Sequence, residues 1–216
     1  MQIISIINQK GGVGKTTTVI NLAAGLAQLE KKVLVIDLDP QGNATTGLGL
    51  SNMENSDETI YGVLNGSKSI LEVIKKTEIK NLDIVTSNVD LSGLEVETAG
   101  DNQRAFILKV KLTPYLNDSR GSYDYILIDC PPSLSLLTVM ALASSHSLVV
   151  PLQTEFFALE GLTQLMKTIE RVKVSVNPEL RIRGILLTMY DKRNKLSSQV
   201  EKEARDYFSD KVYHTV

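Results

Sequence analysis

The chain has no tryptophan, one cysteine and two histidines, and only 5% of its 216 residues are aromatic. A lone cysteine, Cys130, cannot form an intramolecular disulfide framework or a multi-thiolate metal site. His146 and His214 lie far apart with no acidic or thiol neighbour at ligand spacing, so we expect both to be structural. The few aromatic residues argue against a carbohydrate-binding or RNA-stacking surface. The cysteine usage predicts a cytoplasmic protein.

Long uninterrupted apolar segments are also missing. The longest apolar region, Leu134 to Leu152, is broken by the polar run 144–147. The apolar run near the N-terminus is too short for a signal peptide, and no basic residue precedes it. We therefore expect no membrane span and no membrane partner.

The composition that remains is 43% hydrophobic and 22% charged, which predicts a single globular domain over residues 1–216. The formal net charge of −2 is unevenly distributed along the chain. Residues 1–166 hold 12 Lys and Arg against 18 Asp and Glu, whereas residues 167–216 hold 11 against 7. The basic final segment fits a surface for a polyanion and a solvated helix face equally well.

Apolar strand-like runs alternate with helical patterns, which predicts an α/β fold with a mostly parallel, twisted sheet flanked by helices. The predicted strands are 3–7, 33–38, 82–86, 125–128, 148–152 and 182–189, and the predicted helices are 16–29, 60–64, 70–74, 133–143, 162–172 and 196–208. Residues 39–55 form a polar connection in this interpretation, and helical segments extend to about Leu116. A last strand begins at Val212 and reaches Val216, where the sequence stops, so the C-terminal end of the domain appears truncated.

A glycine-rich loop follows the first predicted strand: Lys10-Gly11-Gly12-Val13-Gly14-Lys15-Thr16-Thr17. Glycine lacks Cβ and can take positive φ, so the backbone N–H groups of such a loop can turn inward around a phosphate. Lys15 supplies a mobile charge for the β- and γ-phosphates and Thr16 a hydroxyl for Mg²⁺. The following helix points its positive dipole end at the anion. The loop therefore predicts ATP and Mg²⁺ as cofactors.

The beginning of this loop departs from the ordinary P-loop pattern. Five residues before Gly14 stands Gln9, where that pattern has glycine, and Lys10 adds a second lysine. This combination is the mark of a deviant Walker A loop and resembles the ParA/MinD group of P-loop ATPases.

Carboxylates stand at the ends of two further predicted strands. Asp129 ends the apolar run 125–128, and Cys130-Pro131-Pro132 stops the strand, so the carboxylate projects from the edge of the sheet where α/β ligands bind. Asp37 and Asp39 flank the end of another strand. A turn leaving the strand explains Pro40 and Gly42 but not two carboxylates, so we interpret this stretch as functional.

The DxDPQGN stretch from Asp37, the IDCPP stretch around Asp129 and the KGGVGKTT loop together resemble the ParA/Soj chromosome- and plasmid-partitioning ATPases. The similarity runs over essentially the whole chain and implies a three-layer P-loop fold. It also implies site residues: Lys10, Lys15 and Asp39 for catalysis; residues 10–17 for the nucleotide; Thr16, Asp37 and Asp129 for Mg²⁺. In this resemblance Asp39 orients or activates the attacking water, and Lys10 reaches across a dimer interface to the partner's phosphates.

The same resemblance implies partners and a location. It implies a homodimer that forms on ATP binding, non-specific DNA, a ParB-like centromere-binding protein, and a nucleoid-associated place in a bacterial cytoplasm. The candidate DNA contacts are basic residues after the strand that ends near Met189, namely Lys192, Arg193 and Lys195. Such phosphate contacts confer affinity without sequence choice and weaken steeply with salt.

Three other functions are compatible with parts of the pattern. A MinD-like membrane-cycling or protein-cluster-positioning ATPase would share Lys10 and Lys15, but the DPQGN segment and the lack of a visible C-terminal amphipathic basic helix weigh against it. A reductase like the nitrogenase iron protein needs two cysteine ligands from each subunit, and we expect Cys130 to be a small buried residue instead. A binding module with a degenerate nucleotide site is disfavoured because Lys15, Thr16, Asp39 and Asp129 are all intact.

Overall fold

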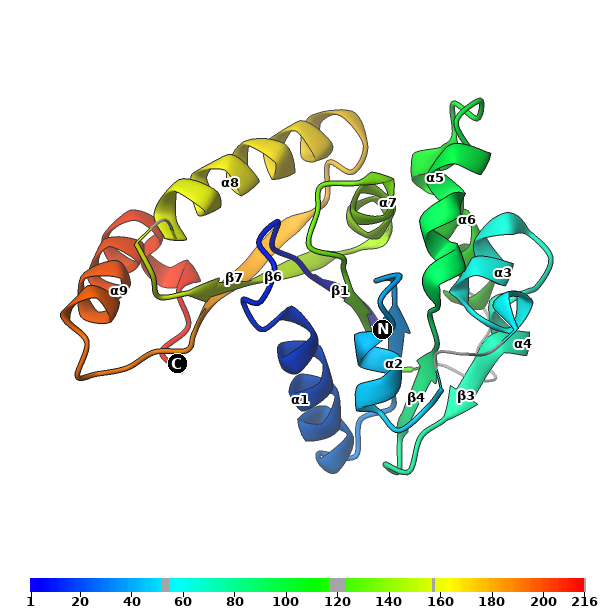
Figure 1. Cartoon of the computed structure of the whole chain (residues 1–216), viewed down its shortest axis with the longest axis horizontal. Coiled ribbons are helices and arrows are strands. Elements are labelled where there is room, and N and C mark those ends of the chain that lie inside the picture. Colours follow the sequence, from blue (N-terminus) through cyan, green and yellow to red (C-terminus); the bar gives the residue numbers. More distant parts are fainter. Residues whose placement is uncertain (52–54, 117–122, 157, 216) are drawn as a thin grey trace.

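One seven-stranded sheet with helices on both faces organises the molecule (Figure 1). The computed structural model describes residues 1–51, 55–116, 123–156 and 158–215. The strands are β1 (Gln2–Ile6), β2 (Val33–Asp37), β3 (Ile74–Lys76), β4 (Leu82–Val85), β5 (Tyr125–Asp129), β6 (Ser147–Gln153) and β7 (Arg181–Thr188). They lie in the order β3-β4-β2-β5-β1-β6-β7, and every pair is parallel except β3 with β4. The predicted α/β class with a mostly parallel sheet is confirmed.

The helices connect the strands and cover the sheet. They are α1 (Lys15–Gln28), α2 (Asn43–Gly47), α3 (Ile60–Asn65), α4 (Ile70–Val73), α5 (Leu94–Glu97), α6 (Ile107–Leu116), α7 (Leu136–Ser144), α8 (Ala158–Ser175) and α9 (Lys195–Phe208). Short 3₁₀ turns occupy residues 56–58, 89–93, 104–106 and 209–211.

The two faces of the sheet are buried by different helices because side chains alternate along a strand. In β2, Leu34 and Ile36 pack in a cluster with α3, α6 and α7. Val33 and Val35 of the same strand pack on the other face, against α1 and α2. Both faces of the central strands are therefore apolar and covered, as a parallel sheet requires.

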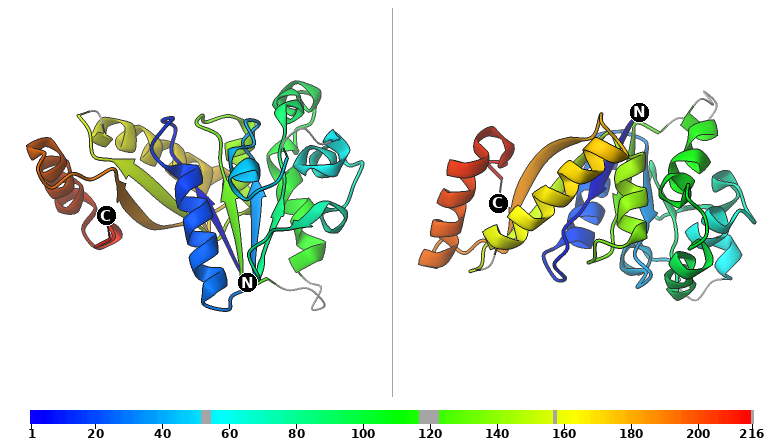
Figure 2. Two further views of the ribbon diagram at one scale, coloured as in Figure 1. Left: turned by 60° about the horizontal axis from the view of Figure 1, so that its bottom comes forward. Right: turned by 90° about the horizontal axis from the view of Figure 1, so that it is seen from above.

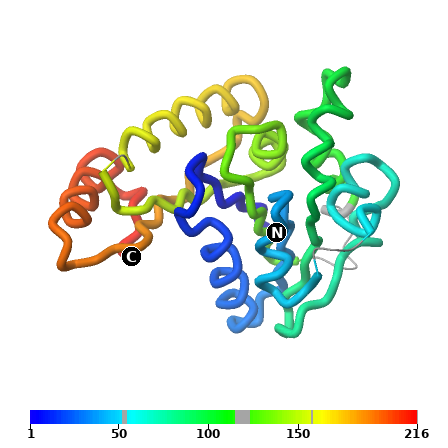
Figure 3. Tube along the Cα trace, in the orientation of Figure 1, coloured from blue at the N-terminus to red at the C-terminus, as the bar shows by residue number. Residues whose placement is uncertain are grey.

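A further apolar cluster joins β6 and β7 to α8 and α9. Leu162, Leu165 and Ile169 recur at helical spacing along α8 and are buried in this cluster. The helix predicted over residues 162–172 lies within α8 and buries its apolar side chains here. Figure 3 shows the C-terminal segment, in red, lying beside α9 and β7.

Three segments differ from the sequence-based prediction. Residues 43–47 form α2 inside the stretch predicted as a polar connection. Ile74 begins the antiparallel strand β3 rather than ending a helix. The predicted last strand from Val212 to Val216 is reduced to one parallel bridge between Val212 and Ile185, and Val216 lies outside the described residues. A 3₁₀ turn over residues 209–211 immediately precedes Val212, so the chain meets β7 only briefly.

The chain reverses its direction across the sheet at β1. From β1 it passes through α1 to β2 on one side, whereas from β5 it passes through α7 to β6 on the other side of β1. Such a switch point opens a crevice at the carboxyl ends of the strands, which we call the carboxyl edge. The loop after β1 lies at this edge, opposite to the N-terminus (Figure 2).

Candidate functional site

The loop between β1 and α1 has the backbone geometry of an anion cradle. Gly12 and Gly14 adopt left-handed conformations, with φ of 75° and 89°, which side chains other than glycine rarely take. Gly14 is also the N-cap of α1 and offers no side chain to its first amides. The N-terminus of α1 therefore leaves its N–H groups available to a phosphate.

The beginning of the loop is anchored to the neighbouring strand and helix. The Asn8 amide donates to the Pro151 carbonyl at the end of β6 at 2.7 Å, and the Lys10 N–H donates back to Asn8 Oδ1 at 3.0 Å. The Gln9 amide donates to the Gly161 carbonyl of α8 at 3.2 Å. The residue that replaces the usual glycine thus connects the loop to α8.

The two lysines of the loop have different environments. Lys15 is buried, and its ammonium donates to the Lys10 carbonyl at 2.9 Å. Burial lowers the pKa of Lys15, and the nearby charges of Asp129 and Asp39 offset only part of that shift. The Lys10 side chain is half exposed and forms an ion pair with Glu155, which follows β6. Lys15 therefore faces into the site, while Lys10 lies on its rim.

Asp129 is fully buried beside Asp37 at the carboxyl edge. The register of β2 and β5 places the two residues directly opposite each other. In the part of the chain that the structure describes, neither carboxylate oxygen of Asp129 has a hydrogen-bond partner. Burial and the charge of Asp37 raise the pKa of Asp129 to about 8. The Thr16 hydroxyl and the Lys15 ammonium lie close enough to offset part of this shift, although Thr16 does not meet hydrogen-bond geometry.

Asp37, in contrast, has partners on both oxygens. Its Oδ1 accepts the Asp39 N–H at 3.2 Å, and its Oδ2 accepts both the N–H and the hydroxyl of Thr45, at 2.8 and 2.7 Å. Burial still raises the pKa of Asp37 to about 6. Asp37 therefore organises the segment between β2 and α2 in addition to facing Asp129.

A cavity of about 430 Å³ opens over these residues. It is lined by Gly11, Gly12, Gly14, Lys15, Thr16, Thr17, Asp39, Gln41, Asn43, Pro132 and Met189. Of the residues predicted for catalysis, nucleotide and Mg²⁺, Lys10, Val13, Asp37 and Asp129 are not among its lining residues. Four of the lining residues were not predicted from the sequence: Gln41, Asn43, Pro132 and Met189. Gln41 and Asn43 belong to the DPQGN stretch, so that motif held the signal for them.

The residues present fit a Mg²⁺-bound nucleoside triphosphate. Asp129 is a buried carboxylate beside the Thr16 hydroxyl whose oxygens have no partner in the described part of the chain, and the left-handed glycines leave the N–H groups of the loop accessible. No group of three or more His, Cys, Asp or Glu side chains in the described ranges could hold a metal ion by itself. A small site of this kind suits Mg²⁺, which keeps several waters and usually takes phosphate oxygens as further ligands.

The basic residues predicted to contact DNA follow β7 at the same edge. Lys192, Arg193 and Lys195 are all exposed. The Arg193 guanidinium is held by Asp191 through two hydrogen bonds of 3.0 and 2.9 Å, and this pairing lowers the pKa of Asp191. The Arg193 charge is therefore paired with Asp191, and the pKa of Glu201 is lowered by a hydrogen bond from Tyr190 and, to a smaller extent, by the charge of Lys192.

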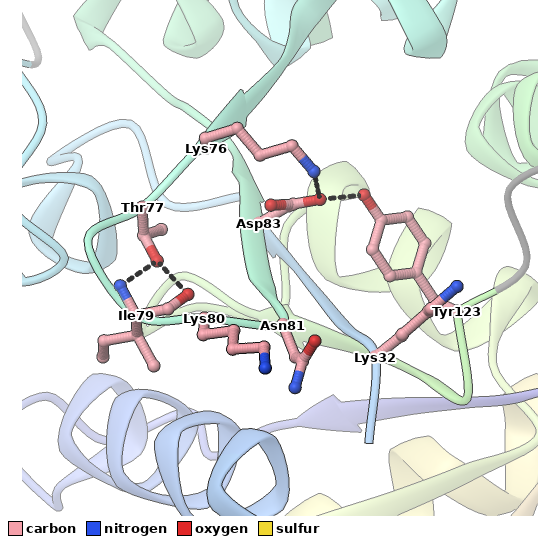
Figure 4. Close-up of a pocket in the computed structure, with 8 residues that line it drawn as sticks. All are labelled: Lys32, Lys76, Thr77, Ile79, Lys80, Asn81, Asp83 and Tyr123. Atoms are coloured by element: carbon pink, nitrogen blue, oxygen red, sulfur yellow. Dashed lines mark hydrogen bonds and ion pairs between the residues drawn. The ribbon is translucent and has the colours of Figure 1, made fainter. Parts of the chain in front are cut away.

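A second pocket, of about 330 Å³, lies at the opposite, amino edge of the sheet (Figure 4). Its walls include Lys32, Lys76 and Lys80. The buried carboxylate in this pocket, Asp83, accepts the Tyr123 hydroxyl at 2.6 Å and the Lys76 ammonium at 2.7 Å on one oxygen. Its charge is satisfied within the chain.

The remaining sequence-based expectations have structural outcomes. Cys130 is buried within the apolar cluster on the α7 face, and burial raises the pKa of its thiol. His146 accepts the Ile3 N–H on Nδ1 at 2.9 Å, which is a structural role as expected. Across the ranges that the structure describes, no helix is both long enough and apolar enough to span a membrane.

Comparison with known proteins places this site in context. The family model AAA_31, described as an AAA domain, matches residues 1–182. The chromosome partitioning protein ParA of Caulobacter vibrioides is 51% identical over 216 residues, covering 100% of this chain and 80% of that protein. The sporulation initiation inhibitor protein Soj of Bacillus subtilis is 47% identical over 215 residues, covering 100% of this chain and 83% of that protein.

A solved structure also resembles the chain closely. The cobyrinic acid a,c-diamide synthase of Mycobacterium smegmatis, solved with a bound ATP analogue and magnesium, superposes with a TM-score of 0.89 and 35% sequence identity. The match covers 97% of this chain and 83% of that one. Nucleotide and Mg²⁺ binding therefore occur within this group of structures.

Proposed function

The chain belongs to the ParA/Soj family of P-loop ATPases, and on that premise we propose that it hydrolyses Mg-ATP to drive chromosome or plasmid segregation in a bacterial cytoplasm. The observation that supports this most is Asp129, a buried carboxylate beside Thr16 and Lys15 that has no hydrogen-bond partner among the residues the structure describes. Ionising a buried carboxyl group in that state is costly unless a cation binds it, which is why its pKa is raised. Mg²⁺ with a triphosphate would supply that cation.

Each residue of the site has a distinct task in this proposal. The Thr16 hydroxyl and the Asp129 carboxylate would hold Mg²⁺, with Asp37 supporting Asp129 from the adjacent strand. The Lys15 ammonium, which donates to the Lys10 carbonyl here, would contact the β- and γ-phosphates, and the N–H groups from Gly11 to Thr17 would surround them. Bound Mg-ATP supplies the phosphoryl group and much of the charge neutralisation.

Asp39 is proposed to orient or activate the attacking water. It lines the cavity together with Lys15 and Thr16, and its Oδ1 accepts the Gln41 N–H at 3.0 Å. Its second oxygen is therefore the one that would accept a hydrogen bond from water. Phosphoryl transfer depends mainly on positioning and electrostatic stabilisation, so a fixed carboxylate serves this role.

Lys10 is proposed to act across a dimer interface. Its side chain lies on the rim of the site, half exposed, where a second copy could meet it. A cation supplied in trans stabilises the charge that develops on the γ-phosphate, and an arginine that acts in this way increases the rate by about 10³- to 10⁵-fold. ATP binding, dimer formation and hydrolysis would then depend on one another.

The ATP-bound dimer is proposed to bind DNA without sequence choice and to associate with the nucleoid. Lys192 and Lys195 are the better candidates for phosphate contacts, because Asp191 neutralises Arg193. A ParB-like centromere-binding protein is the proposed partner that stimulates hydrolysis.

The decisive experiment combines dimerisation with activity. Size-exclusion chromatography with light scattering should show an ATP-dependent dimer for the unsubstituted chain and a monomer for Lys10→Ala. Asp39→Ala should bind ATP and remain a dimer because it does not hydrolyse the nucleotide. Normal dimerisation by Lys10→Ala would contradict the trans role, and rapid hydrolysis by Asp39→Ala would contradict the role of Asp39. ATPase assays with and without non-specific DNA and a candidate partner test whether these two components stimulate hydrolysis, as a role in DNA segregation requires.

A further inference from the structure

We propose that Thr45 is a positioning residue for hydrolysis, which fixes the segment that carries Asp39. Thr45 is fully buried and lies in α2, eight residues after Asp37. Its hydroxyl occupies a junction between the ends of β2 and β4 and the beginning of α2. This inference rests on the proposed role of Asp39.

The first contact of Thr45 provides an acceptor for the N-terminus of α2. Gly42, the N-cap of α2, adopts a left-handed conformation with φ of 64° and has no side chain to accept the first amides of the helix. Asp37 Oδ2 accepts the Thr45 N–H at 2.8 Å instead, and the Thr45 hydroxyl donates to the same oxygen at 2.7 Å. A carboxylate from the preceding strand therefore takes the place of a local cap.

The second contact of Thr45 connects a different strand. The same hydroxyl oxygen accepts the Ser87 N–H, two residues after the end of β4, at 3.0 Å. β2 and β4 are neighbours in the sheet, so one buried hydroxyl joins both strand ends to α2. A hydroxyl has one donor, which is used here, and two acceptor lone pairs. Valine has the shape of threonine but could make neither hydroxyl contact, although its backbone N–H could still donate to Asp37.

These contacts fix Asp39 from both sides. On one side, the Asp39 N–H donates to Asp37 Oδ1 at 3.2 Å. On the other, the Asp39 carbonyl accepts the Gly42 N–H at 2.9 Å, and Gly42 leads directly into α2. Asp37 therefore clamps the segment through Asp39 and Thr45 at once. Loss of the Thr45 hydroxyl would loosen the far end of the clamp and let Asp39 move relative to Lys15 and Thr16.

The experiment compares three variants of the full chain. Thr45→Val removes the hydroxyl, and Thr45→Ser retains it. Thr46→Val is the matched control, since the Thr46 hydroxyl donates to the Gly42 and Asn43 carbonyls of its own turn, at 3.2 and 3.3 Å. Hydrogen exchange of the amides in residues 39–46 is measured without nucleotide, and kcat and KM for Mg-ATP are measured separately. Thermal unfolding confirms that each variant is folded at the assay temperature.

We expect Thr45→Val to increase exchange in residues 39–46 by about tenfold or more and to lower kcat about 10- to 100-fold, while KM changes less than about threefold. The substitution leaves the residues of the glycine loop unchanged, so KM should remain nearly the same. Thr45→Ser should restore both readouts to within about threefold, and Thr46→Val should behave like the unsubstituted chain. A merely structural role would not produce a selective loss of kcat with rescue by serine.

Three outcomes would overturn the role of Thr45: unchanged exchange in Thr45→Val, increased exchange with an unchanged kcat, or a rise in KM as large as the fall in kcat. A double-mutant cycle with Asp39→Asn separates this failure from failure of the proposed role of Asp39. If Thr45 acts through Asp39, Thr45→Val should lower kcat little further in the Asp39→Asn background. Asp39→Asn alone hydrolysing ATP normally would instead remove Asp39 from its role.

Discussion

Asp83 and Asp129 are both buried carboxylates, and they lie at opposite edges of the same sheet. At the amino edge, Asp83 accepts hydrogen bonds from the Tyr123 hydroxyl and the Lys76 ammonium (Figure 4). At the carboxyl edge, Asp129 has no hydrogen-bond partner within the described ranges, and its pKa is raised to about 8. A buried charge that the chain satisfies itself supports the fold, whereas an unsatisfied one destabilises the fold and indicates a ligand. The carboxyl edge is therefore where function is expected.

Of the substitutions that test this difference between the two edges, Asp129→Asn should have the largest effect, on the rate of ATP hydrolysis. The amide is nearly the same size but carries no charge for Mg²⁺, so we expect hydrolysis to fall by about 10²-fold or more. Steady-state phosphate release over a Mg²⁺ titration would measure this. Asp83→Asn is the matched control at the other edge and should retain the rate to within about twofold. A nearly normal rate in Asp129→Asn would remove Asp129 from the metal site.

The same substitution should stabilise the protein without nucleotide at higher pH. The pKa of Asp129 is raised from 3.8 to about 8 in the folded chain. Its stabilising contribution is therefore complete below about pH 4 and is lost as the pH rises through about 8. Asp129→Asn should lack this loss. Its free energy of unfolding should therefore rise, relative to that of the unsubstituted chain, by about 2 to 4 kcal/mol as the pH increases from about 5 to 8. Urea unfolding at several pH values measures the gain, and a constant difference would contradict it.

Asp83→Ala should have the opposite profile at the amino edge. It removes the acceptor of Tyr123 and Lys76, so we expect a loss of about 1 to 3 kcal/mol in the free energy of unfolding. Hydrolysis by the folded variant should be unchanged, because the pocket that contains Asp83 is remote from the loop after β1. Urea unfolding and ATPase assays together test this. A fall in kcat without a loss of stability would mean that the two edges are not functionally distinct.

The contrast also explains which parts of the molecule the sequence predicts well. The glycine loop, Asp39 and Asp129 belong to continuous motifs, and the residue types in each motif indicate a chemical role. The class and order of the central elements follow from apolar periodicity. Local pattern was sufficient to predict that residues of the glycine loop and Asp39 come together at the carboxyl edge, whereas their chemical roles stay predictions.

The parts that escaped prediction depend on distant contacts. α2 has glycine at its N-cap, and the acceptor for its amide is the side chain of Asp37 in the preceding strand. The sequence around the start of α2 therefore has no capping residue from which the helix could be predicted. Glu155 approaches Lys10 only after β6 pairs with β1. The pairing of Arg193 with Asp191 is close in sequence but depends on side-chain geometry, which periodicity does not show.

Both edges carry exposed lysines, which provides a test of the proposed DNA surface. Replacing Lys192 and Lys195 with Gln should weaken binding of the ATP-bound protein to non-specific DNA about five- to tenfold at moderate salt. The slope of log affinity against log salt should fall in magnitude by about 2. Replacing Lys32 and Lys80 at the amino edge should leave affinity within about twofold. Fluorescence anisotropy over a salt series measures both, and equal losses at the two edges would contradict an edge-specific surface.

The smallest effect should come from Glu155→Gln at the rim of the carboxyl edge. The ion pair with Lys10 is partly exposed, and such pairs are worth about 0 to 1 kcal/mol. If Lys10 must leave Glu155 to reach a second copy, this variant should dimerise up to about fivefold more tightly with a non-hydrolysable ATP analogue. Sedimentation velocity measures the dissociation constant. Glu160→Gln, an exposed position on α8, is the control, and weaker dimerisation of Glu155→Gln would show that the pair aids assembly.

The central place of β1 in the sheet has a consequence for biosynthesis. β1 precedes the other described strands in the chain, yet its partners among them are β5 and β6, which begin at Tyr125 and Ser147. The loop after β1 then depends on Pro151, Gly161 and Thr188 for its hydrogen bonds. Long-range pairing of this kind is slow, and the waiting segment is exposed to misassociation. The nascent chain therefore completes its nucleotide-binding loop only after Thr188 has emerged, although the loop itself is translated far earlier.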